Sequence, residues 1–132
     1  MPHLLDTQIL IWALISPEKL SLQTKSLMQN HEIFISQITL FEIAIKQKIG
    51  KLLELDIPIY MLANQIEQDG FILLPLKTCH IESYSDIPLF ADHRDPFDRI
   101  LLSTALSENM PIISADRNFE LYSSKVHILM NG

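Results

Sequence analysis

Four acidic side chains, each lying where an apolar run gives way to polar residues, are the groups best placed to do chemistry. They are Asp6, Glu42, Asp98 and Asp116. Carboxylates that converge in one pocket repel one another and therefore favour a bound cation. Because the chain has one cysteine and no paired-histidine motif, its oxygen donors favour Mg²⁺ or Mn²⁺ over zinc. Such an ion supplies a nucleophilic water near neutral pH and neutralises phosphate charge, as phosphodiester hydrolysis requires.

Local helix and turn rules offer each acid a purely structural alternative. Asp6 can cap the helix that follows it, and Asp116 can form an Asx turn. Thr39 and Glu42 have the spacing of a capping box, in which the glutamate reaches back to the threonine backbone. Position in the sequence alone therefore leaves both explanations open.

The neighbours of two acids favour the metal site. Glu42 follows Phe41 and Asp98 follows Phe97, so both carboxylates are expected in partly buried surroundings, where unpaired charge is costly. A metal ion would relieve that cost. Asp95 stands just before a proline and can be either a further ligand or the cap of the helix that carries Asp98.

The elements that must position these acids alternate along the whole chain. Short apolar runs predict strands at His3–Leu5, Ile33–Ile35, Phe71–Leu74, Ile112–Ser114 and Val126–Leu129. Helical patterns lie between them, at Thr7–Leu14, from Ser16 or Ser21 to Asn30, at Thr39–Ile49, Pro58–Gln68 and Thr78–Ser85, and from Asp95 past Leu106. This alternation predicts an α/β fold: a three-layer α/β/α sandwich around a central, mainly parallel sheet of four to five strands.

In open parallel sheets, ligands bind beyond the carboxyl ends of the strands, where the strand order reverses. Asp6 directly follows the first expected strand, and Asp116 follows the fourth by one residue. Asp98 lies in the first turn of the helix before that fourth strand. The acids are therefore expected along one rim of the sheet.

Length and composition bound the remaining possibilities. The 132 residues, of which 48% are hydrophobic, predict one domain over residues 1–132, with a buried sheet and room for an apolar partner surface. The net charge of −6 argues against a broad nucleic-acid-binding face. A cation in the acidic cluster would neutralise much of that charge, and nearby Lys and Arg side chains would then decide which ligands approach. No apolar run approaches the roughly 20 residues that span a bilayer. With a single cysteine and no leader pattern, we expect a cytoplasmic protein without a membrane partner.

Four segments together resemble the PIN-domain family, and within it the VapC-like toxins of type II toxin–antitoxin systems. They are Leu4–Trp12, Ser36–Ile43, His93–Arg99 and Ile113–Phe119. Each motif alone is weak, but their order and spacing match over essentially the whole chain.

The resemblance implies that Asp6, Glu42, Asp98 and Asp116 form an acidic metal site. Asp98 matches the acid that the family shares on this helix, whereas Asp95 remains either a ligand or a cap. Small hydroxyl positions that orient ligands match Thr7 and Ser114, and both residues are expected to contact the substrate. Gln8 occupies a place where Asn or His is more usual. Lys46 and Arg99 are expected to steady the substrate phosphate.

The same resemblance implies a Mg²⁺- or Mn²⁺-dependent endoribonuclease that hydrolyses RNA, acts as a toxin, forms a homodimer and is silenced by a cognate antitoxin. His93, beside Arg94, is expected at the rim of the site, where it either contacts phosphate or is solvated. One alternative is a non-catalytic PIN-like interaction module that binds a basic partner peptide. A phosphoacceptor domain of flavodoxin-like topology ranks last, because only one acid follows the first expected strand.

Overall fold

A five-stranded sheet in which every neighbouring pair of strands is parallel forms the centre of the molecule. The computed structural model describes residues 1–132. The strands are β1 (Pro2–Leu5), β2 (Glu32–Ser36), β3 (Ile72–Leu74), β4 (Ile112–Ser114) and β5 (Ile128–Met130), in the spatial order β3-β2-β1-β4-β5. The predicted parallel α/β architecture is confirmed.

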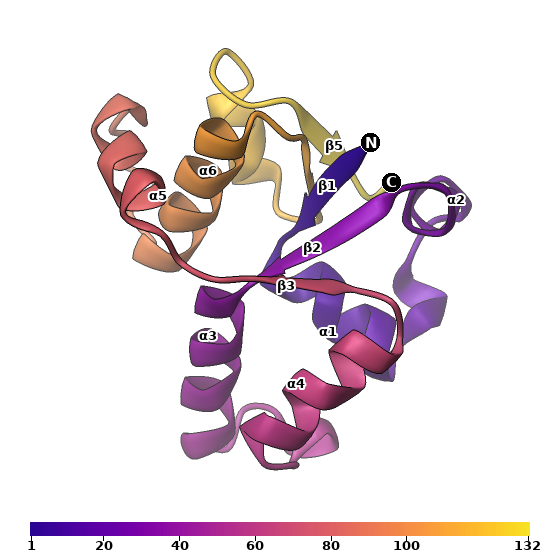
Figure 1. Ribbon diagram of the computed structural model, residues 1–132. Coiled ribbons are helices and arrows are strands. Elements are labelled where there is room, and N and C mark those ends of the chain that lie inside the picture. Colours follow the sequence, from indigo (N-terminus) through magenta and orange to yellow (C-terminus); the bar gives the residue numbers. More distant parts are fainter.

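Helices cover both faces of this sheet (Figure 1). The α-helices are α1 (Thr7–Ile15), α2 (Leu22–Asn30), α3 (Gln37–Lys48), α4 (Ile59–Gln68), α5 (Thr78–Glu82) and α6 (Pro96–Glu108). Short 3₁₀ turns are η1 (Pro17–Lys19), η2 (Leu53–Leu55), η3 (Ser83–Asp86) and η4 (Arg117–Tyr122). In Figure 1, α1, α3 and α4 lie below the sheet, whereas α5 and α6 lie above it. No helix combines the length and apolar character needed to cross a membrane.

Alternate residues of the central strands are buried in two separate hydrophobic cores, one on each face of the sheet. On β1, Leu5 packs in the core beneath α1, α3 and α4, whereas Leu4 packs in the core beneath α6. On β4, Ile113 and Ile112 divide between the same two cores. Successive side chains of a strand point to opposite faces. The uninterrupted apolar runs are therefore explained by a sheet that is buried on both sides.

The sheet reverses its order at β1, and this reversal positions the candidate site. The chain proceeds from β1 to β2 and β3 on one side, then returns to β4 and β5 on the other. The backbone N–H of Asp6 donates to the Ile113 carbonyl at 3.0 Å, which fixes the carboxyl ends of β1 and β4 side by side. This is the place where open parallel sheets bind ligands.

The start of α3 corrects one sequence-based alternative. The hydroxyl of Ser36 accepts from the Ile38 N–H at 3.1 Å, so the helix begins at Gln37. The capping box of Thr39 and Glu42 is therefore wrong, because Glu42 lies more than one full turn inside the helix. Its carboxylate is free to point toward another element.

Other element ends shift by smaller amounts. β5 begins at Ile128, two residues later than expected, because the Val126 N–H donates to the Tyr122 carbonyl at 3.0 Å and continues the preceding turn. The helix from Thr78 ends at Glu82 and continues as η3. The predicted start of α6 is confirmed, since the Asp95 carboxylate accepts from the N–H groups of Phe97 and Asp98.

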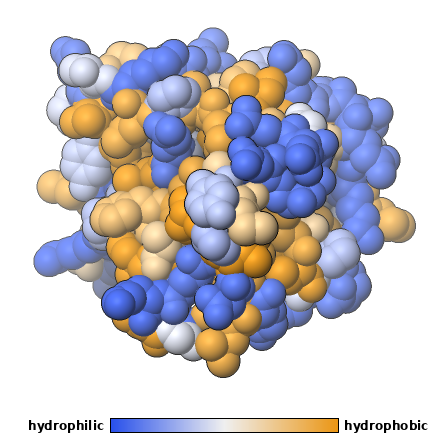
Figure 2. Space-filling model, turned by 60° about the horizontal axis from the view of Figure 1, so that its bottom comes forward, coloured by the Kyte–Doolittle hydropathy of each residue, from blue (hydrophilic) through white to orange (hydrophobic).

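An apolar stripe on α3 remains at the surface. Phe41, Ile45 and Ile49 recur every four residues and are 58%, 36% and 58% exposed, so they share one side of the helix. Tyr60 and Met61 of α4 are exposed as well. Figure 2 brings this side of the molecule forward and shows apolar side chains interspersed with polar ones. Surface of this kind is typical of a protein contact site.

Candidate active site

Five carboxylates line one cavity of about 380 Å³ at the carboxyl ends of β1 and β4. They are Asp6, Glu42, Asp95, Asp98 and Asp116. The acids come from the end of β1, the middle of α3, the start of α6 and the turn after β4. The expected convergence on one rim of the sheet is thus present in the structure.

Asp6 is held by chain groups on both of its oxygens. One oxygen, Oδ1, caps α1 by accepting from the Ile9 N–H at 2.8 Å. The other, Oδ2, accepts from the Ser114 hydroxyl at 2.5 Å and from the Ala115 N–H at 3.3 Å. Burial raises the pKa of Asp6 to about 6, although these hydrogen bonds favour the ionised form. The side chain is therefore both a helix cap and a buried acid at the cavity wall.

Glu42 approaches the cavity from α3 and joins it to α1. The Thr7 hydroxyl donates to Glu42 Oε1 at 2.6 Å and lies 3.3 Å from the Thr39 hydroxyl. The Lys46 ammonium lies 3.6 Å from Glu42 Oε2, one turn along the same helix. Lys46 also lines the cavity, which makes it the one basic side chain among the five carboxylates.

One group of potential ligands consists of His93, Asp98 and Asp116, which each offer one ligand atom within 4.8 Å of the others. Asp6 and Glu42 line the same cavity but lie outside this group. Burial is the main cause that raises the pKa of Asp98 to about 6, and the negative charges of Asp95 and Asp116 raise it further. A hydrogen bond from His93 opposes that rise.

A directed chain of hydrogen bonds fixes the Asp98 carboxylate from behind. Arg99 Nη1 donates to the Tyr122 hydroxyl at 3.0 Å, which lies 2.7 Å from His93 Nδ1. The other ring nitrogen, Nε2, lies 3.0 Å from Asp98 Oδ2. When Asp98 is ionised, Nε2 must carry the proton, so Nδ1 of the neutral ring accepts from the tyrosine. His93 then orients Asp98 and has no lone pair left for a metal ion.

Three expectations for side chains around the site are corrected by this arrangement. Arg99 does not line the cavity: it is buried, with its guanidinium bonded to Tyr84, Tyr122 and the carbonyls of the 87–88 segment. His93 is also buried instead of lying at the rim. Ser114 is fully buried and bonds to Asp6, so it holds a cavity wall in place.

The chemistry of the donor set fits a hard divalent cation. A carboxylate offers about four lone-pair positions, so Asp6 keeps a free position beyond its three chain donors. Burial, and to a lesser extent nearby carboxylates, raise the pKa values of Asp6 and Asp98, so their ionised forms are disfavoured in the protein. A cation among these oxygens would stabilise those ionised forms. Five of the ten residues that line the cavity offer carboxylates, the ligand type that Mg²⁺ and Mn²⁺ prefer.

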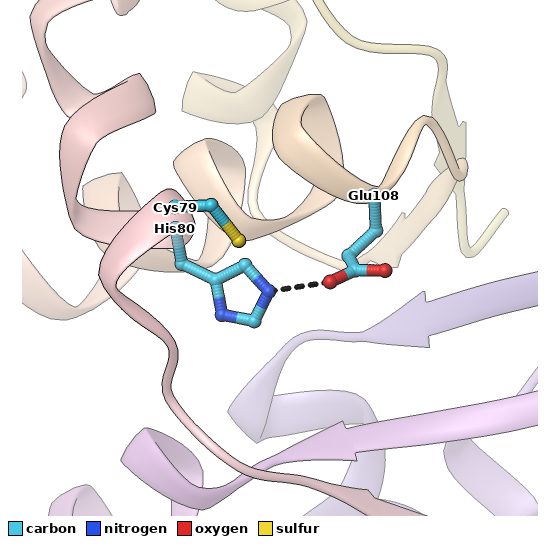
Figure 3. Close-up of side chains that lie close together, drawn as sticks. All are labelled: Cys79, His80 and Glu108. Carbon is cyan, nitrogen blue, oxygen red and sulfur yellow. Dashed lines mark hydrogen bonds and ion pairs between the residues drawn. The ribbon is translucent and has the colours of Figure 1, made fainter.

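A second group of potential ligands, Cys79, His80 and Glu108, lies between α5 and α6 (Figure 3). Nδ1 of His80 accepts from the Lys77 N–H at 3.1 Å, so Nε2 carries the proton and donates to Glu108 at 2.7 Å. The Ser103 hydroxyl also donates to the His80 carbonyl. Neither ring nitrogen has a free lone pair for a metal or for a cysteine nucleophile. The hydrogen bond between the buried His80 and the partly exposed Glu108 is therefore a structural contact that fastens α5 to α6.

Solved structures share this fold over nearly their whole length. A chain of VapBC2 from Rickettsia felis, bound to a DNA fragment from its promoter, aligns with a TM-score of 0.73 at 17% identity, covering 98% of both chains. A chain of DNA-bound VapBC from Salmonella typhimurium gives 0.71 at 17% identity, covering 100% and 99%. A chain of FitAcB from Neisseria gonorrhoeae gives 0.66 at 20% identity, covering 96% of each.

No curated protein matches the sequence. The sequence model of the PIN domain, by contrast, matches residues 3–125. That range includes all five carboxylates of the cavity, strands β2, β3 and β4, and β1 from its second residue. The chain therefore belongs to the PIN-domain family.

Proposed function

We propose that the protein is a divalent-metal-dependent endoribonuclease that hydrolyses RNA phosphodiester bonds. The observation that carries this proposal is the convergence of five carboxylates on one cavity in a chain of the PIN-domain family, whose members are generally nucleases. The raised pKa values of Asp6 and Asp98 add support, because buried acids of this kind concentrate at functional sites.

The residues proposed to hold Mg²⁺ or Mn²⁺ are Asp6, Glu42, Asp98 and Asp116. When bound there, the ion would lower the pKa of a water and neutralise charge on the phosphate. The Asp95 carboxylate caps α6 with one oxygen and lines the cavity with the rest of its side chain. We therefore assign Asp95 an auxiliary role, as cap and as a source of negative charge.

The side chains also have roles of their own in the proposed hydrolysis. The hydrogen bond with His93 orients Asp98, which lines the cavity where the ion would bind. The water oxygen bonds to phosphorus while the bond from phosphorus to the leaving 3′ oxygen breaks; the attacking water loses a proton to solvent, and the 3′ oxygen takes up a proton from solvent to become a hydroxyl. Lys46 can contact a phosphate oxygen, and Thr7 holds Glu42 in place. Ser114 orients the Asp6 carboxylate by donating a hydrogen bond to it.

We further propose that this nuclease is the toxin of a type II toxin–antitoxin pair and acts in the cytoplasm. The solved structures with the same fold include VapBC complexes from Rickettsia felis and Salmonella typhimurium, which supports an antitoxin protein as partner. The exposed stripe of Phe41, Ile45 and Ile49 offers apolar surface for that antitoxin or for a second copy in a homodimer.

The direct test is cleavage of single-stranded RNA by the purified protein. We expect cleavage with Mg²⁺ or Mn²⁺ and none with EDTA. Asp6→Asn, Asp98→Asn and Asp116→Asn should each abolish it. The matched control is Asp56→Asn, which removes an exposed acid away from the cavity and should leave cleavage unchanged.

Equal activity of the wild type and the three cavity variants would overturn the assignment. Calorimetry separates the nuclease from an interaction module of the same fold. Divalent-ion binding that disappears in Asp98→Asn supports the nuclease. Absence of ion binding, together with tight binding of a basic peptide, would favour the interaction module.

A further inference from the structure

A second cavity, of about 330 Å³, adjoins the acidic one and has the opposite charge. Gln8, Trp12 and Lys46 line both cavities. The second cavity adds Lys19 and Lys51, so that three lysines face a single acid, Glu54. In the acidic cavity, by contrast, five carboxylates surround one lysine. The two cavities therefore form one continuous recess whose charge reverses at Lys46.

Trp12 stands at the border between the two cavities. It is the only tryptophan of the chain and is half-buried, packing against the core below the sheet. The ammonium of Lys19 lies over the ring, 5.8 Å from its centre. An aromatic face beside lysines is a combination that stacks nucleobases and contacts the phosphates next to them.

We propose that the second cavity binds the nucleotide next to the cleaved phosphate, with its base stacked on Trp12 and its backbone phosphate contacted by Lys19 and Lys51. This inference rests on the proposed nuclease function, because the acidic cavity then fixes where the scissile phosphate lies. Lys46, which borders both cavities, contacts the strand between the two positions. A stacked base takes the place of Lys19 over the ring, and the displaced ammonium is free to reach the phosphate.

The charges favour a nucleic acid over a peptide as the occupant. A basic peptide suits the acidic cavity but is repelled by Lys19, Lys46 and Lys51. An acidic peptide suits the lysines but brings carboxylates toward five others. A phosphodiester strand suits both cavities when a divalent cation occupies the acidic one, because its next phosphate then meets the lysines. Stacking on Trp12 also requires an unpaired base, so the strand must be single.

Fluorescence of Trp12 provides the test, because no other tryptophan contributes to the signal. A hydrolysis-resistant analogue of a short single-stranded RNA is titrated into the wild-type protein in magnesium buffer, with DNA of the same sequence in a second arm. We expect saturable quenching from stacking. Anisotropy of the same RNA analogue, labelled with fluorescein, then gives the affinities of further variants, each compared with the wild type.

Each variant reports on one part of the proposed contact. Trp12→Leu should weaken binding by about 10-fold or more, whereas Trp12→Phe keeps an aromatic face and should retain most of the affinity. Lys19→Gln with Lys51→Gln should weaken binding and reduce the slope of log affinity against log salt by about 1.4. The control Lys125→Gln removes an exposed lysine that lines neither cavity and should change little.

The outcomes distinguish this site from the nuclease itself. Absence of quenching, or equal losses for Lys125→Gln and the Lys19/Lys51 double variant, would overturn the nucleotide site even if the wild type cleaves RNA. Quenching with the expected variant losses, in a protein that cleaves nothing, would support the site and overturn the nuclease. Quenching by a poly-glutamate peptide but not by RNA or DNA would overturn the nucleotide in favour of a protein ligand.

Discussion

Helix α6 carries a histidine-bonded carboxylate at each end, and the two pairs behave in opposite ways. At its start, Asp98 lies 3.0 Å from His93; at its end, Glu108 lies 2.7 Å from His80. Both histidines are buried. Nevertheless, the pKa of Asp98 is raised to about 6, whereas the pKa of Glu108 is lowered.

The helix dipole alone predicts the reverse, because it stabilises an anion at the start of a helix and disfavours one at the end. Burial and like charges outweigh it at Asp98, which is surrounded by the carboxylates of Asp95 and Asp116. Glu108 is stabilised first by the His80 hydrogen bond and further by the ammonium of Lys77. The ionised form of Glu108 is therefore stabilised by its own neighbours, whereas the ionised form of Asp98 is disfavoured by burial and by nearby negative charge. That difference separates a structural contact from a candidate metal site.

The strongest test of this difference is Asp98→Asn. We expect RNA hydrolysis to fall by about 1,000-fold, a typical loss when one group that stabilises a transition state is removed. Stability in EDTA should not fall, since the change removes a buried carboxylate that Asp95 and Asp116 repel. Steady-state cleavage and thermal unfolding measure the two effects. A clear loss of stability in EDTA would show that Asp98, like Glu108, has a structural role.

Tyr122→Phe should have a smaller effect on the same end of α6. The change removes the hydroxyl between Arg99 and His93 and leaves a buried donor unpaired, at a cost of about 1–3 kcal/mol. Because His93 then loses its orienting partner, kcat should fall by about 10-fold, with little change in KM. A change confined to unfolding temperature would show that the hydrogen-bond chain is purely structural.

Glu108→Gln tests the other end of α6. It should lower the free energy of unfolding by about 1 kcal/mol through loss of the charged hydrogen bond with His80, and leave cleavage unchanged. The lowered pKa of Glu108 means that its contribution is present above the ordinary glutamate pKa and is lost as pH falls. The wild type and the variant should therefore converge in acid. Denaturant unfolding at several pH values measures the difference.

The smallest expected effect is a change with pH in how much Mg²⁺ stabilises the folded protein. Because the pKa values of Asp6 and Asp98 are raised to about 6, their contribution to the stability of the metal-free protein is fully present below about pH 4 and lost as pH rises through about 6. Mg²⁺ compensates only for ionised acids. Its effect on Tm should be about 3 °C larger at about pH 7.5 than at about pH 5. Equal shifts at both pH values would contradict a site at these carboxylates.

The sequence predicts well what depends on near neighbours. Asp95 caps α6 as expected, because Pro96 fixes the first turn beside it. The rim of acids is also predicted, since strand ends in a parallel sheet share one edge. The start of α3 is missed because Ser36 and Thr39 both satisfy capping rules, and only the chain path after β2 selects Ser36.

The surroundings of His93 and Arg99 could not be predicted in the same way. Their positions depend on how residues 87–95 fold back over Tyr122, which lies 29 positions from His93. No local periodicity records such a contact. The apolar residues Ile87 and Phe90 were the available signal that this loop packs inward, since Ile87 is buried and Phe90 contacts Tyr122. The adjacent polar residues His93 and Arg94 are equally compatible with a loop that is exposed to solvent.

The hydrogen bond between Asp6 and Ser114 joins positions 108 apart in the chain. During translation, Asp6 is therefore made well before its partner Ser114, and Asp116 follows two residues later. If the protein is the proposed nuclease, a growing chain on the ribosome holds an incomplete set of carboxylates until nearly the whole domain has emerged. Synthesis itself then delays activity, which gives an antitoxin time to meet the toxin as it folds.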